Sequence, residues 1–445
     1  MGMGSVQEDA AAKLGRSGRG AKGRLLAWCS FDWANSSYPT VVVTFVFAAY
    51  FATAVAETPE IGTALWGKAL ALSGLAVAVL APIFGALADQ GGRRKPWIGA
   101  FTAVAVLSAA GLWWIEPDPA FALVALLLIA LGNAAFEFGQ VFYNAMLPDV
   151  APPERLGRIS GWAWSVGYAG GLVCLALSLV LFAQPSPPLF GLDAAMAEHV
   201  RIIGPFVALW FALFALPLFL FVPDAPPTRQ PAVQALRRGL RSLASTLRAL
   251  PRHGQMGRYL LAHMIYADGL NTLFAFGGLY AAGTFNMSYE EILVFAILLN
   301  VAAGLGAAGF AWVDDWIGPK RTILIALTGL FFAGVAILVV ETRLSFTLLG
   351  CVIGLFIGPA QSASRSLMVR LTPPAHRTEL FGLYALSGKA TAFVGPALVG
   401  AVTLWADSQR AGMATILVFF LVGGLLMPPL REPARGVSAA RGVSA

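Results

Sequence analysis

The sequence predicts an all-α integral membrane protein with twelve membrane-spanning helices arranged as two similar six-helix halves. Its 445 residues are 58% hydrophobic and only 12% charged, whereas a soluble domain is typically about 25% charged. Apolar stretches of about 20 residues, long enough to cross a bilayer as helices, recur along the chain. Basic residues gather in alternate loops, and the second half of the chain repeats features of the first.

The apolar stretches define the expected spans and the domain boundaries. We expect spans at about 27–53, 62–87, 96–115, 120–145, 159–182, 202–222, 258–283, 290–313, 321–340, 345–366, 380–404 and 411–429. These predict an N-terminal bundle over 25–222, a basic linker over 223–257 and a C-terminal bundle over 258–430. Residues 1–24 and 431–445 are predicted to be cytoplasmic tails. The first tail is polar and basic and lacks the apolar core of a signal peptide, so we expect it to be disordered.

The distribution of basic residues predicts the orientation. Only Arg201, Arg343 and Arg410, with Lys68 near a helix end, fall on one side of the membrane. The other side holds basic residues in the first tail, in loops near 93–95, 155–158, 320–321 and 365–377, in the linker and in the last tail. By the positive-inside rule both termini are cytoplasmic, as an even number of spans requires. The net charge of +7 therefore reflects orientation and does not imply nucleic acid.

The basic linker has two open interpretations. It holds Arg229, Arg237, Arg238, Arg241, Arg248 and Arg252. An amphipathic helix lying on anionic lipid would account for this pattern. A binding site for a partner would do so too.

No catalytic or metal-binding pattern is present in the sequence. The cysteines Cys29, Cys174 and Cys351 lie alone, and the four histidines are scattered. There is no phosphate-binding GxxxxGK[ST] motif and no GxSxG motif. We therefore expect neither an enzyme nor a cofactor or metal, and no direct use of ATP.

Matched segments in the two halves indicate an internal repeat. Gln140 precedes Pro152-Pro153 by twelve residues, and Gln361 precedes Pro373-Pro374 by the same number. Gly161 and Gly382 each follow their proline pair by eight residues, so the offset is constant at 221. The segments 89–92 and 315–318 both run from Asp to Gly and precede a basic pair. The pattern predicts two parallel halves related by an axis along the membrane normal.

The loop between the second and third spans resembles the signature of the major facilitator superfamily. The matching residues are Gly85, Leu87, Ala88, Asp89, Gly92, Arg93 and Arg94, whereas Gln90 departs from the usual basic residue. In the second copy Ala311 replaces the first glycine. The charges in this loop are expected to form a conformational latch, which bridges neighbouring helix ends in the outward-open state and separates when the cytoplasmic side opens. Its predicted members are Asp89, Arg93, Arg94, Asp315, Lys320 and Arg321; a purely topological role for the basic ones is the alternative.

Longer motifs resemble one subgroup of that superfamily. FDWANSSYPTVV, FYNAMLPDVAPPERLGRISGWAWSVGYAGG, QSASRSLMVRLTPP and LFGLYALSGKATAFVGP are similar to the bacterial unidentified major facilitator family. That family is related to the fungal vacuolar amino-acid effluxer linked to autophagy. The resemblance implies a multi-pass transporter of the bacterial cytoplasmic membrane, with amino acids among the candidate substrates.

Two polar pairs are the first candidates for substrate binding or proton coupling. Asp32 and Asn35 lie three apart near the start of the first span, and Asp268 and Asn271 repeat this spacing in the seventh. A carboxylate inside a membrane span is costly and is a functional candidate by default. Asp32 lies near the helix start, so a helix cap is its alternative role. Asp268 is deeper, where no cap is needed, and is the stronger candidate for the coupling site.

A polar stripe in the fourth span gives further candidates. Glu137, Gln140 and Asn144 follow Asn133 along one helix face. Hydrogen bonding between helices is the alternative role for this stripe. In the second half Gln361 repeats Gln140 and Arg365 takes the place of Asn144, where it could also extend to the membrane interface.

Lys389, ten residues into the eleventh span, is the lysine placed deepest in a predicted helix. It is expected to pair with a carboxylate or to bind an anionic group of the substrate. The sequence does not identify which carboxylate it meets.

Taken together, these features predict a secondary transporter that works by alternating access on a small polar molecule. Protons are the expected coupling ion, and we expect a monomer surrounded by membrane lipid. A sodium-coupled carrier or a uniporter remains open, as do the substrate and the direction. The alternative from another class is a non-transporting receptor or a lipid-handling protein on the same fold.

Overall fold

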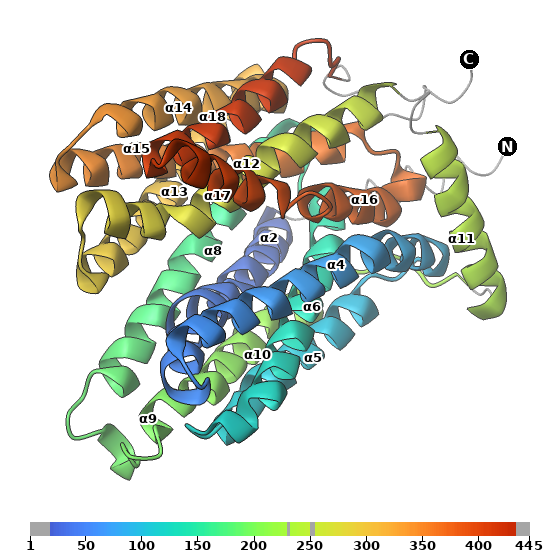
Figure 1. Ribbon diagram of the computed structural model, residues 1–445. Helices are drawn as coiled ribbons and strands as arrows, with labels where there is room; N and C mark the ends of the chain where they lie inside the picture. The colour runs from blue at the N-terminus through green and yellow to red at the C-terminus, as the bar shows by residue number, and fades with distance from the viewer. Residues whose placement is uncertain (1–17, 229–231, 250–253, 433–445) are drawn as a thin grey trace, which may run out of the picture.

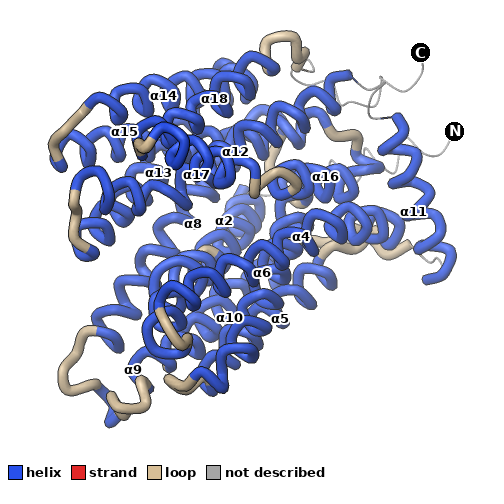
Figure 2. The backbone as a smooth tube through the Cα atoms, in the orientation of Figure 1, coloured by secondary structure: helices blue, strands red, loops and turns tan. Residues whose placement is uncertain are grey.

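The computed structural model describes residues 18–228, 232–249 and 254–432, and its regular elements there are all helices (Figures 1 and 2). The helices from α2 to α10 pack with one another and form the N half. Those from α12 to α18 form the C half, drawn from yellow to red above the N half in Figure 1. The helix α11 connects the two and lies across one end of the molecule.

The α-helices of the N half follow the six predicted spans closely. They are α2 (Gly18–Asn35), α3 (Val46–Tyr50), α4 (Pro59–Gly91), α5 (Lys95–Gly111), α6 (Ala122–Ala145), α7 (Leu147–Val150), α8 (Leu156–Ser178), α9 (Glu198–Arg201) and α10 (Ile203–Phe221). The connecting helix is α11 (Ala232–Ala249).

The C half is built in the same way, except that its eleventh predicted span is split in two. Its helices are α12 (Gly254–Phe285), α13 (Tyr289–Ile317), α14 (Pro319–Val339), α15 (Arg343–Leu371), α16 (Arg377–Lys389), α17 (Val394–Ala406) and α18 (Gln409–Leu426).

Eleven stretches in the described part of the chain are long and apolar enough to cross a membrane. The helix α12 is not among them, although it has 32 residues. Its polar residues His263, Asp268 and Asn271 lower its hydropathy. A multi-pass membrane protein is therefore confirmed, while the number of twelve spans stays a prediction.

The first span continues through wide, π-helical turns from Tyr38 to Phe45. Pro39 has no N–H to donate, which disturbs the regular bonding of this helix. The Thr44 hydroxyl donates to the Pro39 carbonyl at 2.8 Å and satisfies the backbone there. The polar first part of the span and its apolar second part are thus joined by a π-helical stretch.

The break between α16 and α17 was not predicted, although the sequence contains its cause. Pro396 lies in the first turn of α17, and its ring and missing N–H prevent an uninterrupted helix through the preceding turn. Tight turns cross the break instead: Ala392 N–H donates to Lys389 O and Val394 N–H to Thr391 O. The chain therefore remains ordered where the helix stops and restarts.

The two halves touch through glycines at the end of the molecule where α4 finishes, here called the closed end. A Cβ on Gly85 would lie 2.4 Å from the Thr378 carbonyl oxygen, so α4 and α16 meet backbone to backbone. Gly161 and Gly382, predicted as repeat mates, play matching roles. A Cβ on either would lie 2.5 Å from a carbonyl oxygen of the other half, that of Ala307 or Ala81 respectively.

The helix α11 packs across this closed end. Gly239 lies against the backbone of Ala86 in α4, and Leu243 is buried beside it. Ser242 donates its hydroxyl proton to Glu379 of α16 at 2.7 Å. One face of the basic linker is therefore occupied by the protein itself, and a lipid-bound role for its other faces stays a prediction.

We predict that Gly85→Ala destabilises the closed end because its added methyl group overlaps backbone. Overpacking of this kind costs about 1–3 kcal/mol. Gly74→Ala is the matched control on the same helix, since a Cβ there meets nothing within 4 Å. Thermal unfolding of the purified variants in detergent checks this, and equal melting temperatures for the two variants would contradict it.

Candidate functional site

A polar cavity of about 370 Å³ lies where the halves face each other. Five of the predicted site residues line it, namely Asp32 and Asn35 of α2 and Glu137, Gln140 and Asn144 of α6. The other lining residues are Ser36, Pro39, Thr40, Thr44, Phe45, Phe136, Trp164, Gly167, Tyr168, Phe274 and Asn300. The predicted polar stripe of the fourth span thus faces this cavity, except for Asn133, which donates to Ser73 of α4.

An ion pair between Arg365 of α15 and Asp32 crosses from one half to the other at the cavity. The Arg365 Nη1 atom lies 3.3 Å from Asp32 Oδ2, and the two side chains are only 2% and 8% exposed. The Tyr143 hydroxyl also donates to Asp32 at 3.0 Å. Asp32 is therefore a bonded member of the interface between halves and does not act as a helix-start cap.

Arg365 is held in place on every side. It donates to the Ser160 hydroxyl and carbonyl oxygens and, at 3.0 Å, to Asn144 Oδ1. Its guanidinium group also lies over the rings of Trp28 and Trp164, 5.2 and 5.7 Å from their centroids. Arg365 and Asn144 are 221 residues apart, so two positions matched by the repeat bond to each other between the halves.

A second ion pair crosses the same interface. Lys389, the last residue of α16, places its Nζ atom 2.8 Å from Glu137 Oε1. These side chains are 29% and 23% exposed, so water reaches this pair more readily than the first. Glu137 is the carboxylate partner that the sequence could not identify.

The remaining predicted residues of the second half lie at or beyond the edge of the cavity. Gln361 accepts a hydrogen bond of 2.6 Å from Tyr168, which lines it. Asp268 and Asn271 are not among the lining residues. Asn271 donates to the Gly388 carbonyl, and Asp268 accepts from the Gly395 N–H, so both face the break between α16 and α17. Asp268 therefore does not converge with Asp32 and Glu137.

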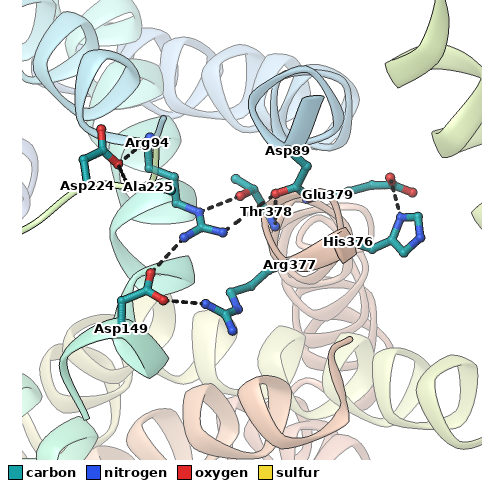
Figure 3. A network of polar contacts seen from close by, with 9 residues as sticks. All are labelled: Asp89, Arg94, Asp149, Asp224, Ala225, His376, Arg377, Thr378 and Glu379. Carbon is teal, nitrogen blue, oxygen red and sulfur yellow. Dashed lines mark hydrogen bonds and ion pairs between the residues drawn. The ribbon is translucent and has the colours of Figure 1, made fainter. Parts of the chain in front are cut away.

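The closed end is joined by a carboxylate that binds the start of a helix in the other half (Figure 3). Asp89 of α4 accepts hydrogen bonds from the backbone N–H groups of Thr378 and Glu379, at 3.0 and 2.9 Å. The first N–H groups of a helix lack partners within it and carry a partial positive charge. Asp89 therefore stabilises the start of α16 from across the interface.

The same arrangement recurs between α13 and α8. Asp315 accepts from the backbone N–H of Arg158 at 3.2 Å and lies 3.3 Å from its side chain. The Gly157 N–H points to the same carboxylate. The donors at 157 and 158 lie 221 residues before those at 378 and 379. The repeat thus produces two equivalent contacts between halves.

Arg94 adds an ionic contact beside Asp89, as Figure 3 shows. It lies 2.9 Å from Asp149 and donates to the Thr378 hydroxyl at 3.0 Å. Arg377 of the C half reaches the other oxygen of Asp149 at 2.8 Å. Asp149 thus joins a cation from each half.

Three predicted latch residues make no contact of this kind. Arg93 is exposed, and Arg321 is exposed at the start of α14. Lys320 donates to the carbonyl oxygens of Pro428 and Leu430 within its own half. The topological role that the sequence left open fits these three better than the latch role.

Sequence reasoning left Arg365 open between a role in the polar stripe and an extension to the membrane interface, and its contacts with Asp32 and Asn144 favour the first. Tyr143 and Asp149 were missed. No spacing rule points to Tyr143 or Asp149, since their partners are distant in sequence.

Comparison with known proteins identifies the family. A family model described as "Vacuole effluxer Atg22 like" matches residues 63–437. The chain belongs to the Atg22-like family. It is a major facilitator superfamily transporter related to Atg22, as the motifs of both halves predicted.

Bacterial and fungal proteins are both similar in sequence to this chain. An uncharacterized MFS-type transporter of Bacillus subtilis (strain 168), YxiO, is 26% identical over 90% of this chain and 93% of its own length. Autophagy-related protein 22 of Cryptococcus neoformans is 26% identical over 60% of this chain and 51% of its own length. The Atg22-like chain thus aligns with nearly the whole bacterial protein and about half of the fungal one.

Solved structures share the fold. The transporter FucP in its outward conformation matches with a TM-score of 0.70 at 16% identity, over 93% of this chain and 99% of that one. The proton:xylose symporter XylE matches with a TM-score of 0.68 at 13% identity, over 93% and 95% of the two chains. At such identities the likeness shows the fold alone.

We predict that Asp89→Ala loosens the closed end, because two hydrogen bonds to a charged acceptor are lost. Each such bond is worth about 1.5–3 kcal/mol, so the closed state should lose at least about tenfold in relative population. The readout is alkylation of Cys29, which is buried near Asp32, in a background with Cys174 and Cys351 replaced.

Gln90→Ala, next to Asp89, is the matched control, because its side chain joins none of these contacts. Faster alkylation of Cys29 in Asp89→Ala than in Gln90→Ala is the expected result. Equal rates would remove Asp89 from the latch.

Proposed function

We propose that this Atg22-like protein is a proton-coupled secondary transporter of small polar metabolites, with amino acids as the first candidates, in a bacterial cytoplasmic membrane. The observation that carries the proposal is the polar cavity between halves that are joined at one end. Carriers that work by alternating access bind substrate between two such halves, near the middle of the membrane.

The distribution of basic residues supports placing the closed end in the cytoplasm. Arg93, Arg94 and the arginines of α11 all lie at this end. In this orientation a cavity shut at the closed end would open toward the outside of the cell. Separation of Asp89 from α16 and of Asp315 from α8 would then accompany opening to the cytoplasm.

The charges at the cavity are sorted by half. Asp32 and Glu137 come from the N half, whereas Arg365 and Lys389 come from the C half. A zwitterion could replace the contact between Glu137 and Lys389 by binding each of them with its opposite charge. This pair is the exchangeable one, because it is partly exposed, whereas Arg365 is fixed by bonds and rings on all sides.

Protons fit the same chemistry. A carboxylate that gains a proton no longer attracts its cationic partner, so protonation of Glu137 would release Lys389 across the interface. Glu137 is thus the carboxylate at the cavity through which a proton would change the contact between the halves.

The deciding experiment is a thermal-shift screen of metabolites on the purified protein, followed by uptake into proteoliposomes under an imposed pH gradient. We expect amino acids to stabilise the protein, and the matching amines and carboxylic acids, which carry one charge each, to have little effect. Stabilisation without uptake would favour the alternative of a non-transporting receptor on the same fold. Stabilisation by lipids alone would favour a lipid-handling protein.

We predict that Glu137→Gln and Lys389→Met each weaken binding of the stabilising amino acid by about tenfold or more. Each removes one charge-assisted hydrogen bond of about 1.5–3 kcal/mol. Glu154→Gln is the control, because Glu154 is exposed and away from the cavity. Binding measured by titration calorimetry should be unchanged in the control, and unchanged binding in both site variants would refute the zwitterion arrangement.

A further inference from the structure

The pair Asp268 and Asn271 spans the break in the eleventh predicted span. Asn271 donates from Nδ2 to the Gly388 carbonyl at 3.1 Å, at the end of α16. Asp268 accepts from the Gly395 N–H at 3.4 Å, in the first turn of α17. One turn of α12 thus connects both sides of the break.

The start of α17 depends on this carboxylate. The residue before the helix, Phe393, has no side chain that can accept a hydrogen bond from the first turn. The Thr391 carbonyl, the usual partner of the Gly395 N–H in a continuous helix, instead accepts from Val394 at 2.7 Å. The Gly395 N–H is therefore left for Asp268, which supplies a cap from a neighbouring helix.

The Asp268 carboxylate has few hydrogen-bond partners for a buried charged group. The residue is 2% exposed, and its Oδ2 atom is buried without a hydrogen-bond partner. The groups that face it are the Gly395 N–H and the Thr391 side chain, neither of which carries a charge.

Two other titratable side chains lie beside the break. They are His263, which bonds to Ser387 of α16, and Lys389, which pairs with Glu137. A buried carboxylate without a countercharge is a favourable place to add a proton.

The space around the carboxyl group is restricted. A Cβ on Gly395 would lie 1.9 Å from Thr272 Oγ1 and 3.0 Å from Asp268 Oδ1. A glycine is thus required for α17 to approach α12 this closely. The small space suits a proton better than a metal ion with its several ligands.

The break also adjoins the cavity through Lys389. This lysine ends α16, one residue after the Gly388 carbonyl that Asn271 binds, and it pairs with Glu137 of the other half. A change in the geometry of the break therefore reaches an ion pair that crosses the interface.

We propose that Asp268 is a proton-binding site set apart from the cavity, and that the break between α16 and α17 conveys its state to the pair of Lys389 and Glu137. This inference rests on the proposed transport function, because the site would serve to couple proton binding to transport. Adding a proton to Oδ2 neutralises the acceptor at the start of α17 and removes its favourable interaction with the helix dipole. The first turn of α17 then loosens, and Lys389 gains freedom to leave Glu137.

The test needs no substrate, so its outcome is separate from that of the transport proposal. Infrared difference spectra between high and low pH on the protein in lipid detect carboxyl protonation. Hydrogen exchange of the amides in 388–397, corrected for the intrinsic effect of pH, measures the break. In the wild type we expect these amides to exchange about two- to fivefold faster at low pH, the change that loss of a charge at a helix end produces.

Asp268→Asn should lose one protonation signal and exchange at the fast rate at both pH values. Gly395→Ala, which pushes the two helices apart, should exchange fast while keeping the signal. Asp407→Asn, at the exposed far end of α17, is the matched control. It loses the signal of an exposed carboxyl group but should keep the pH-dependent exchange of the wild type at 388–397. A difference spectrum of Asp268→Asn that matches the wild-type spectrum, or wild-type exchange at 388–397 that does not depend on pH, would overturn the proposal.

Discussion

The Arg365 guanidinium lies almost fully buried between the two halves, and a charge in such a place must be matched or it destabilises the protein. Leaving a buried charge without its partner costs about 3–5 kcal/mol. Asp32, Ser160 and Asn144 all direct oxygen atoms at Arg365, and two tryptophan rings stack beside it. Since these groups come from α2, α6 and α8, one side chain of the C half aligns three helices of the N half.

This constraint explains why the polar residues of the fourth span and the first span meet. Asn144 must reach Arg365, so the face of α6 that carries Glu137 and Gln140 turns toward the interface. Glu137 on that same face forms the ion pair with Lys389. The cavity is a consequence of satisfying charges in a medium of low dielectric constant.

Much of this arrangement could be predicted from residue type and spacing. Apolar length gave the positions of the spans to within a few residues, and the offset of 221 located the glycines at which the halves touch. Five of nine predicted site residues line one cavity because polar residues on a membrane helix turn away from lipid. Pair partners were out of reach, because Lys389 and Glu137 are far apart in sequence. The position of Asp268 was out of reach too, because its partner is the backbone N–H of Gly395 at a helix break that the apolar pattern does not show.

The contacts at the closed end join a carboxylate on one helix to backbone N–H groups on another. Substitutions therefore affect the two partners differently. Every residue except proline supplies the same N–H group, so positions 158, 378 and 379 can vary without loss of the bond to Asp89 or Asp315. The aspartates have no such freedom, because each oxygen of the Asp89 carboxylate accepts one N–H group, whereas a side-chain amide has only one acceptor oxygen. Position 157 is restricted for a different reason, since a Cβ there would overlap the Asp314 side chain at 2.3 Å. Natural variants of this protein should therefore keep two aspartates and one glycine, whereas changes at the helix starts lose only the side-chain contacts made there.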